Sequence, residues 1–291
     1  MPVDLYYVPG SAPCRAVLLT ARALNINLNL KLVDLHHGEH LKEDFIKLNP
    51  QHTVPTLVDE GFAVCESRAI ITYLVNKYAR GSALYPDEPK ARALVDQRLY
   101  FDIGTLYARF ADYFVSIIPP ATFRHRSTRK TILITLMSGH WSPTVRFSHN
   151  FLPCTVKLWN CHQQYFRTNT TYSGGVRVKF YVGKIYFYPQ LFAGVAEDKE
   201  KLAKVEDALK ILDIFLEGQK YVAGANLTVA DLSLVAGVSS MEASEIDFKK
   251  YANVKRWYEV VKATAPGYQE ANEKGLEAFK SLVNGRNSNT R

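Results

Sequence analysis

Long apolar runs are absent from this sequence. The longest, TILITLM at residues 131–137, is far shorter than the roughly 18 apolar residues of a membrane-spanning helix. The N-terminal stretch also lacks the basic and apolar segments of a secretory signal, so we expect a cytoplasmic protein without a membrane partner. With 291 residues, 47% of them hydrophobic and 22% charged, the chain is typical of one or two globular domains.

Cysteines are few, which argues against a disulfide-stabilised fold. The spacing of the four cysteines forms no disulfide framework and is typical of reduced thiols in a cytosolic protein. The paired short spacing of a zinc site is also missing from the histidines and cysteines of the middle of the chain, so we expect no metal. These residues are His140, His149, Cys154, Cys161 and His162.

Acidic residues are absent from residues 115–187. This segment contains ten Lys or Arg and no Asp or Glu, whereas the whole chain has 36 Lys or Arg and 28 Asp or Glu. The net charge of +8 therefore comes from this segment, and the rest of the protein is close to neutral. The segment shows no sustained helical or strand period and contains the adjacent prolines Pro119 and Pro120. We expect most of it to be disordered.

The chain before this segment has the pattern of a small α/β domain. Val3–Val8 predicts a strand, Pro13–Leu24 a helix with proline in its first turn, and Asn29–Asp34 a second strand. These three elements form a right-handed βαβ unit. The turn Asp59–Gly61 predicts a β-hairpin, and Ser67–Ala79 predicts a helix after it.

The remaining elements are helical. Apolar residues recur at helical spacing over residues 95–114 and again over residues 202–216. Thr228 lies three residues before Asp231, as in the capping box at the start of a helix. The sequence therefore predicts an α/β domain followed by an all-helical one.

Several long motifs resemble those of arthropod delta-class glutathione transferases and follow in the same order. The resemblance covers residues 1–114 and about 188–285. The motifs are VPGSAPCR, GEHLKEDFIKLNPQHTVPTLVDEGFAVCESRAI, QRLYFDIGTLYARFADYF and YVAGANLTVADLSLVAGVSS.

The resemblance implies the fold and the activity of that family. Residues 1–80 would form a thioredoxin-like α/β domain, 81–86 a linker, and 87–291 an all-α domain interrupted by residues 115–187. The activity would be conjugation of glutathione, as co-substrate, to hydrophobic electrophiles in xenobiotic detoxification, with dehydrochlorinase or peroxidase side activity possible in the family. The partner would be a second copy in a homodimer.

Ser11 and Cys14 compete for the chemical role in the first turn. The nucleophile in glutathione transfer is a thiolate, and a hydroxyl that donates to its sulfur lowers the pKa of the thiol. Ser11 precedes a predicted helix N-terminus, which also favours an anion, and it matches the family's catalytic serine. Local sequence alone would favour a turn-stabilising serine. Cys14 has the second position of a Cys-x-x-Cys motif whose attacking cysteine is replaced by Ser11, so we expect a packed residue there.

The family pattern also implies which residues bind the tripeptide. Val54 would pair its backbone with the cysteinyl part of glutathione, next to a cis-proline at Pro55. Glu66 and Ser67 would meet the two charged groups of the γ-glutamyl end. Arg68 matches a position of structural support near the site or the dimer interface. The remaining matched positions are His40 and His52 for the glycyl carboxylate, Thr53 beside them, and Asp102, which would reach glutathione on the partner subunit.

The electrophile pocket is expected to be aromatic. Tyr107, Phe110 and Tyr113 lie three residues apart on one predicted helix and match the family's pocket wall. Burial in an ordinary helical core explains Phe110 nearly as well. The sequence does not identify the electrophile.

Residues 115–187 interrupt the family pattern between Phe114 and Tyr188. One interpretation is an intron translated in frame; the alternatives are a basic loop for nucleic acid or anionic lipid, or a metal site. Basic and aromatic residues alternate in VRVKFYVGKIYF, yet the segment matches no known nucleic-acid-binding module, so we expect no nucleic-acid partner. A second functional hypothesis follows: a protein that binds glutathione or hydrophobic ligands without turnover, because the segment disrupts the pocket.

Deletion of residues 115–187, joining Phe114 to Tyr188, is expected to give a more stable and more active protein. Ordering a long segment of poor periodicity costs more conformational entropy than its packing returns. Thermal unfolding and conjugation rates of the two chains would test this, with limited proteolysis expected to cleave the full chain first within the segment. A protease-resistant segment whose removal lowers stability or activity would contradict the interpretation.

Overall fold

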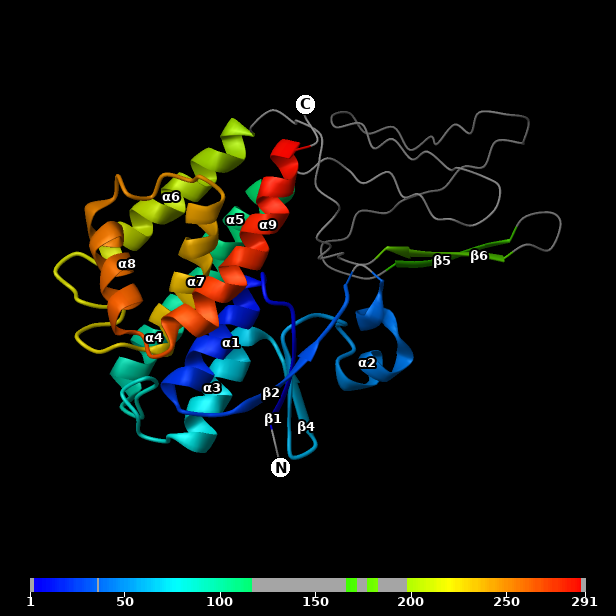
Figure 1. Ribbon diagram of the computed structural model, residues 1–291, viewed down its shortest axis with the longest axis horizontal. Coiled ribbons are helices and arrows are strands. Elements are labelled where there is room, and N and C mark those ends of the chain that lie inside the picture. The colour runs from blue at the N-terminus through cyan, green and yellow to red at the C-terminus, as the bar shows by residue number, and fades with distance from the viewer. Residues whose placement is uncertain (1–2, 36, 117–165, 172–176, 183–197, 289–291) are drawn as a thin grey trace. The chain divides into compact units, whose positions relative to one another are not determined.

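The structure is a computed structural model that describes residues 3–35, 37–116, 166–171, 177–182 and 198–288 (Figure 1). The chain divides into two compact units. The first joins the segments Met1–Ala121 and Tyr188–Arg291, and the second is Thr122–Phe187. Each unit is described separately.

The N-terminal part of the first unit is an α/β domain with a four-stranded mixed sheet in the order β2-β1-β3-β4. Strand β1 runs parallel to β2 and antiparallel to β3, and β3 and β4 form the predicted hairpin. The predicted βαβ unit is therefore confirmed, whereas η1 and α2 were not predicted. The elements are β1 (Val3–Tyr7), α1 (Ala12–Ala23), β2 (Leu28–Leu32), η1 (Glu39–Leu41), α2 (Glu43–Leu48), β3 (Thr56–Asp59), β4 (Phe62–Cys65) and α3 (Ser67–Tyr78).

The strand register brings three chain segments to one end of the sheet. Tyr6 of β1 pairs with Thr56 of β3, and Thr56 pairs with Cys65 of β4. The end of β1, the start of β3 and the end of β4 consequently lie side by side. The turns that precede or follow these three positions meet at this end, and the candidate site is built there.

The C-terminal part of the first unit is helical. The helix predicted over residues 95–114 begins earlier, at Pro89, and is interrupted by a π-helical turn, η2, at Asp102–Leu106. A π-helical turn inside a longer helix is frequently found at a functional site. The elements are α4 (Pro89–Phe101), η2, α5 (Tyr107–Ser116), α6 (Lys199–Phe215), α7 (Val229–Ala243), α8 (Ala252–Thr264), η3 (Gln269–Glu273, also π-helical) and α9 (Lys274–Ser288).

Helix α7 forms the centre of this helical part and contacts α1, α4, α8 and α9. It is buried from Val229 to Met241, as expected for a helix that is apolar around most of its circumference. The predicted capping box is present: the Thr228 backbone N–H donates to Asp231 Oδ2 at 2.9 Å. The other oxygen of Asp231 accepts from Val222 N and Trp257 Nε1, each at 2.8 Å, which fixes the start of α7 to α8.

The second unit contains an antiparallel hairpin of β5 (Phe166–Thr171) and β6 (Arg177–Val182). This hairpin was not predicted, because residues 115–187 show no sustained strand period in their sequence. The rest of the second unit, including the residues tested for zinc spacing, lies outside the described residues. Its predicted disorder therefore stays a prediction.

None of the helices in the described ranges has both the length and the apolar character that crossing a membrane requires.

Candidate active site

Ser11 occupies the N-cap of α1, at the end of the turn that leaves β1. Its backbone N–H donates to Val8 O at 3.2 Å, and its side-chain oxygen accepts from Cys14 N at 3.4 Å. Pro13 lies in the first turn of the helix, where the missing N–H of proline costs nothing. The side chain is 5% exposed. A hydroxyl thus lies at the positive end of a 12-residue helix, at the end of the sheet where the three segments meet.

Cys14 is fully buried in the first turn of α1, as expected for a packed residue. Burial raises the pKa of the Cys14 thiol to about 11, against a smaller lowering by its hydrogen bond with Ser11. A thiol with this pKa is protonated at neutral pH. Because the thiolate is the reactive form, Cys14 is not poised for redox or nucleophilic chemistry.

The segments before β3 and after β4 adopt special backbone conformations. The Val54–Pro55 bond is cis, as predicted. His52 and Glu66 have φ angles of 46° and 68°, in the left-handed region that disfavours side chains. Glu66 is also the N-cap of α3, and its side chain makes no capping hydrogen bond within the described part of the chain. The first N–H groups of α3 beside Ser67 are therefore not capped by that carboxylate.

A chain of polar contacts leads from Ser67 into the helical part. Arg68 Nη1 donates to Ser67 Oγ at 2.9 Å, and Arg68 Nη2 and Nε donate to Asp102 Oδ2 at 2.6 and 3.1 Å. Ser233 Oγ of α7 donates to the same oxygen at 2.6 Å. These contacts join α3 to η2 and α7, and the predicted supporting role of Arg68 stays a prediction.

Asp102 is 1% exposed, at the first residue of the π-helical turn η2. Its Oδ2 is engaged by Arg68 and Ser233, and its Oδ1 has no hydrogen-bond partner among the described residues. Within one chain the carboxylate is therefore directed inward, toward α3 and α7. The predicted contact with glutathione on a partner subunit is not visible in a single chain and stays a prediction.

The two candidate histidines lie close together. The ring centroids of His40 and His52 are 6.1 Å apart, and His40 is 8% exposed. Burial, together with the neighbouring His52, lowers the pKa of His40, so this imidazole is neutral at neutral pH.

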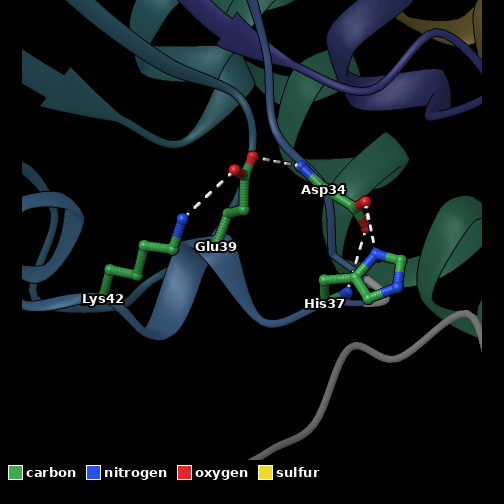
Figure 2. A network of polar contacts seen from close by, with 4 residues as sticks. All are labelled: Asp34, His37, Glu39 and Lys42. Carbon is green, nitrogen blue, oxygen red and sulfur yellow. Dashed lines mark hydrogen bonds and ion pairs between the residues drawn. The ribbon is translucent and has the colours of Figure 1, made fainter.

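The loop that carries His40 is ordered by a polar network that sequence reasoning missed (Figure 2). Asp34 accepts from His37 N at 3.0 Å and contacts His37 Nδ1 at 2.6 Å, and its own N–H donates to Glu39 Oε2 at 2.8 Å. Lys42 Nζ donates to Glu39 Oε1 at 3.3 Å. The hydrogen bond with Asp34 raises the pKa of His37. Because these side chains are exposed, the network orients the loop rather than adding much stability.

Two of the predicted pocket-wall residues, Tyr107 and Phe110, belong to an aromatic row along α5. Tyr107 and Phe110 are 6.4 Å apart between ring centroids, and Phe110 and Phe114 are 5.7 Å apart. The row continues to Phe279 of α9, 5.2 Å from Phe114. Phe110 and Tyr113 are 3% and 6% exposed, so in this structure they also form part of the hydrophobic core. The guanidinium carbon of Arg68 lies 5.3 Å from the centre of the Tyr107 ring.

The buried guanidinium of Arg15, one helical turn after Ser11, was also missed. Its Nη1 donates to Ser239 Oγ at 2.8 Å and to Asn272 Oδ1, and its Nη2 donates to Ala236 O at 3.0 Å and to Ser240 Oγ. An arginine in an otherwise apolar helix indicates a buried polar contact of this kind, although the sequence does not identify the residues that accept its hydrogen bonds.

No group of three His, Cys, Asp or Glu side chains that could hold a metal ion lies within the described ranges.

Comparison with known proteins identifies the family of this site. The family model for the glutathione S-transferase N-terminal domain matches residues 5–83, and that for the C-terminal domain matches residues 178–264. A solved delta-class glutathione transferase of Nilaparvata lugens is 41% identical, with a TM-score of 0.70 over 98% of this chain and 99% of that chain. The chain belongs to the glutathione S-transferase family.

Other solved transferases are similar as well. One from Bombyx mori is 33% identical, with a TM-score of 0.69 over 97% of this chain and 98% of that chain. An epsilon-class enzyme from the housefly, Musca domestica, is 30% identical, with a TM-score of 0.67 over 98% of both chains. The predicted transferase fold, with its thioredoxin-like and helical parts, is thus confirmed. The family model for the C-terminal domain matches this chain from residue 178, which lies inside residues 115–187. The limits of the predicted insertion therefore stay a prediction.

The Arg68–Asp102 pair predicts a large effect on stability. The two side chains are 12% and 1% exposed, so Arg68→Ala would leave a buried carboxylate without its cation. We expect a loss of about 3–5 kcal/mol in the free energy of unfolding of the transferase, measured by urea denaturation. The double variant Arg68→Ala/Asp102→Asn removes the charge as well and should lose less than the single variant. A loss below about 1 kcal/mol for Arg68→Ala, as for a surface pair, would contradict this role.

Proposed function

We propose that this protein is a delta-class glutathione transferase of the cytoplasm in which Ser11 activates the thiol of glutathione for attack on hydrophobic electrophiles, as in detoxification. The 41% identity to the delta-class enzyme of Nilaparvata lugens supports the class. The position of Ser11 at the N-cap of α1, where the three segments of the site meet, carries the proposal.

Two effects stabilise the thiolate at this position. The Ser11 hydroxyl donates a hydrogen bond to the sulfur of glutathione, which favours the charged form and lowers the pKa of the thiol. The N-terminus of α1 adds its positive potential. The thiol proton has by then left to solvent, and the sulfur attacks the electrophilic carbon and forms the thioether. In a substitution the leaving group takes the electron pair. In an addition the activated double bond takes the pair and is then protonated from solvent. Ser11 forms no covalent intermediate.

The tripeptide lies across the end of the sheet in this proposal. The backbone of Val54 pairs with the cysteinyl part, next to Thr53 and the cis-proline Pro55. The uncapped N–H groups at the start of α3, with the Ser67 hydroxyl, bind the γ-glutamyl carboxylate, and Glu66 accepts from its ammonium group. His40 and His52, on loops that reach the same end, meet the glycyl carboxylate.

The electrophile lies against three aromatic side chains of α5, which are Tyr107, Phe110 and Tyr113. Burial raises the pKa of Tyr107 to about 12, so its phenol is protonated at neutral pH and can donate to a polar atom of the substrate. The rings of Phe110 and Tyr113 supply the apolar surface that hydrophobic electrophiles require.

A homodimer is also part of the proposal. Helix α4 and its π-helical continuation expose Leu94, Tyr100 and Ile103, which are 46%, 72% and 37% exposed in the single chain. The homodimer itself is inferred from the resemblance to delta-class glutathione transferases. A second copy of the chain, covering α4, would place Asp102 near the interface.

Ser11→Ala is the variant that tests the proposal. Loss of one hydrogen bond to a charged sulfur costs roughly 1.5–3 kcal/mol, which raises the pKa of bound glutathione by about one to two units. The value of kcat/KM should fall about tenfold to a hundredfold at acidic to neutral pH. This fall is slightly smaller than the pKa shift alone implies, because a thiolate of higher pKa is the better nucleophile. The loss should vanish at a pH above both pKa values.

Cys14→Ala is the matched control, because it changes the neighbouring side chain and keeps the hydroxyl. It should retain the wild-type thiol pKa, read from the ultraviolet absorbance of the bound thiolate against pH. An unchanged titration in Ser11→Ala, or a loss of rate that is the same at every pH, would mean that another group activates the sulfur. Glutathione binding without any turnover in the wild-type chain would instead favour the non-catalytic binding protein.

A further inference from the structure

Helix α9 packs directly on the turn that carries Ser11. A side-chain carbon added at Gly275 would lie 2.5 Å from Pro9 O and 2.7 Å from Arg15 Cδ, closer than real Cβ atoms approach other atoms. Gly10 makes the reciprocal contact, because a Cβ there would lie 3.3 Å from Phe279 N. The backbone of α9 therefore touches the turn, and only glycine at position 275 allows this approach.

A buried polar cluster also ties α1 to η3 and α7. Arg15, one turn after Ser11 on α1, is fully buried and donates to Asn272 in η3, directly before α9. Asn272 Nδ2 in turn donates to Ser239 Oγ of α7 at 3.2 Å. Asn272 is itself 0% exposed. A buried guanidinium needs its acceptors at fixed positions, so α1, α7 and η3 are held in one relative placement.

The two contacts bracket the candidate serine. Gly275 meets Pro9, two residues before Ser11, and Asn272 binds Arg15, four residues after it. Phe279, one turn further along α9, lies against both Gly10 and the aromatic ring of Phe114. Helix α9 thus contacts both the turn that carries Ser11 and the aromatic row of α5.

We propose that Asn272 and Gly275 are positioning residues for glutathione activation: through Arg15 and Pro9 they set the place of the Ser11 hydroxyl. The inference rests on the proposed role of Ser11. A hydrogen bond weakens steeply when its distance or angle departs from the optimum, so a small shift of the turn is enough to lose it. Neither residue is expected to contact glutathione.

Gly275→Ala is the direct test, since the added methyl group must displace the Pro9 carbonyl. We expect the pKa of the bound thiol to rise by about one unit and kcat/KM near pH 6.5 to fall about tenfold, while KM for glutathione changes little. The readout is the absorbance of the bound thiolate against pH in the full chain. Asn272→Ala gives a second variant without steric conflict, for which we expect a shift of the same sign.

The matched control is Gly237→Ala in the buried helix α7. A Cβ at this glycine would lie 3.9 Å from Tyr107 Cδ2 and 4.0 Å from Asp102 Oδ1, in ordinary van der Waals contact. The control adds the same methyl group to a buried helix without touching the turn, and we expect its thiol pKa to equal that of the wild type. Thermal unfolding of each variant verifies that the comparison is between folded proteins.

The decisive arm repeats Gly275→Ala and Asn272→Ala in the Ser11→Ala background. If the two residues act by placing the hydroxyl, neither causes a further shift once the hydroxyl is gone. A shift that persists without the hydroxyl overturns the inference, and so do unchanged pKa values for both variants when Ser11→Ala itself raises the pKa. An unchanged pKa in Ser11→Ala overturns the proposed function, and the inference falls with it.

Discussion

The turn that joins β1 to α1 is held by two sets of contacts at once. The pairing of Tyr6 with Thr56 ties the end of β1 to β3, and through β3 to the end of β4. The backbone of α9 also approaches Pro9 and Gly10 closely. A hydroxyl at the N-cap between them has little freedom to move, and a fixed donor stabilises developing charge better than a mobile one.

Two arginines, Arg15 in α1 and Arg68 in α3, connect the segments that carry Ser11 and Ser67 to the helical part. Arg15 is fully buried, and the side chain of Arg68 is 12% exposed. Arg15 reaches α7 and η3 from α1, and Arg68 reaches Asp102 and, through it, Ser233 from the start of α3. Removing a guanidinium from water is costly unless its acceptors are in place. A shifted packing of α1 or α3 would leave these charges buried without their partners, so the two contacts favour one docking of the α/β domain on the helices. Both arginines stand next to residues of the proposed glutathione site.

Local pattern predicted most of the first unit. Alternation, helical spacing, proline in a first turn and the Thr228–Asp231 capping box gave the strands, α1, α3, α6 and the start of α7. The cis bond at Pro55 followed from the family resemblance. Long-range contacts were not accessible in this way, because the partners of Arg15 lie more than 200 positions away in the sequence and no spacing rule relates them. The same holds for Gly275, where the carbonyl oxygen of Pro9, in the turn before α1, lies too close to admit a Cβ atom. The apolar residues of 95–114 recur at a spacing typical of one continuous helix, which is why the π-helical turn at Asp102–Leu106 was not predicted.

Proton release on glutathione binding tests the central claim most directly, since it reports the charge of the sulfur in the unmodified protein. Calorimetric titration at pH 7 in buffers of different ionisation enthalpy gives the number of protons released per site. A free thiol with a pKa of about 8.5 is almost fully protonated at this pH, so lowering the pKa by one to two units predicts release of about 0.2 to 0.7 of a proton. S-methyl glutathione, which has no thiol proton, should release none beyond the background of its other groups. Equal release for the two ligands would contradict thiolate formation at Ser11.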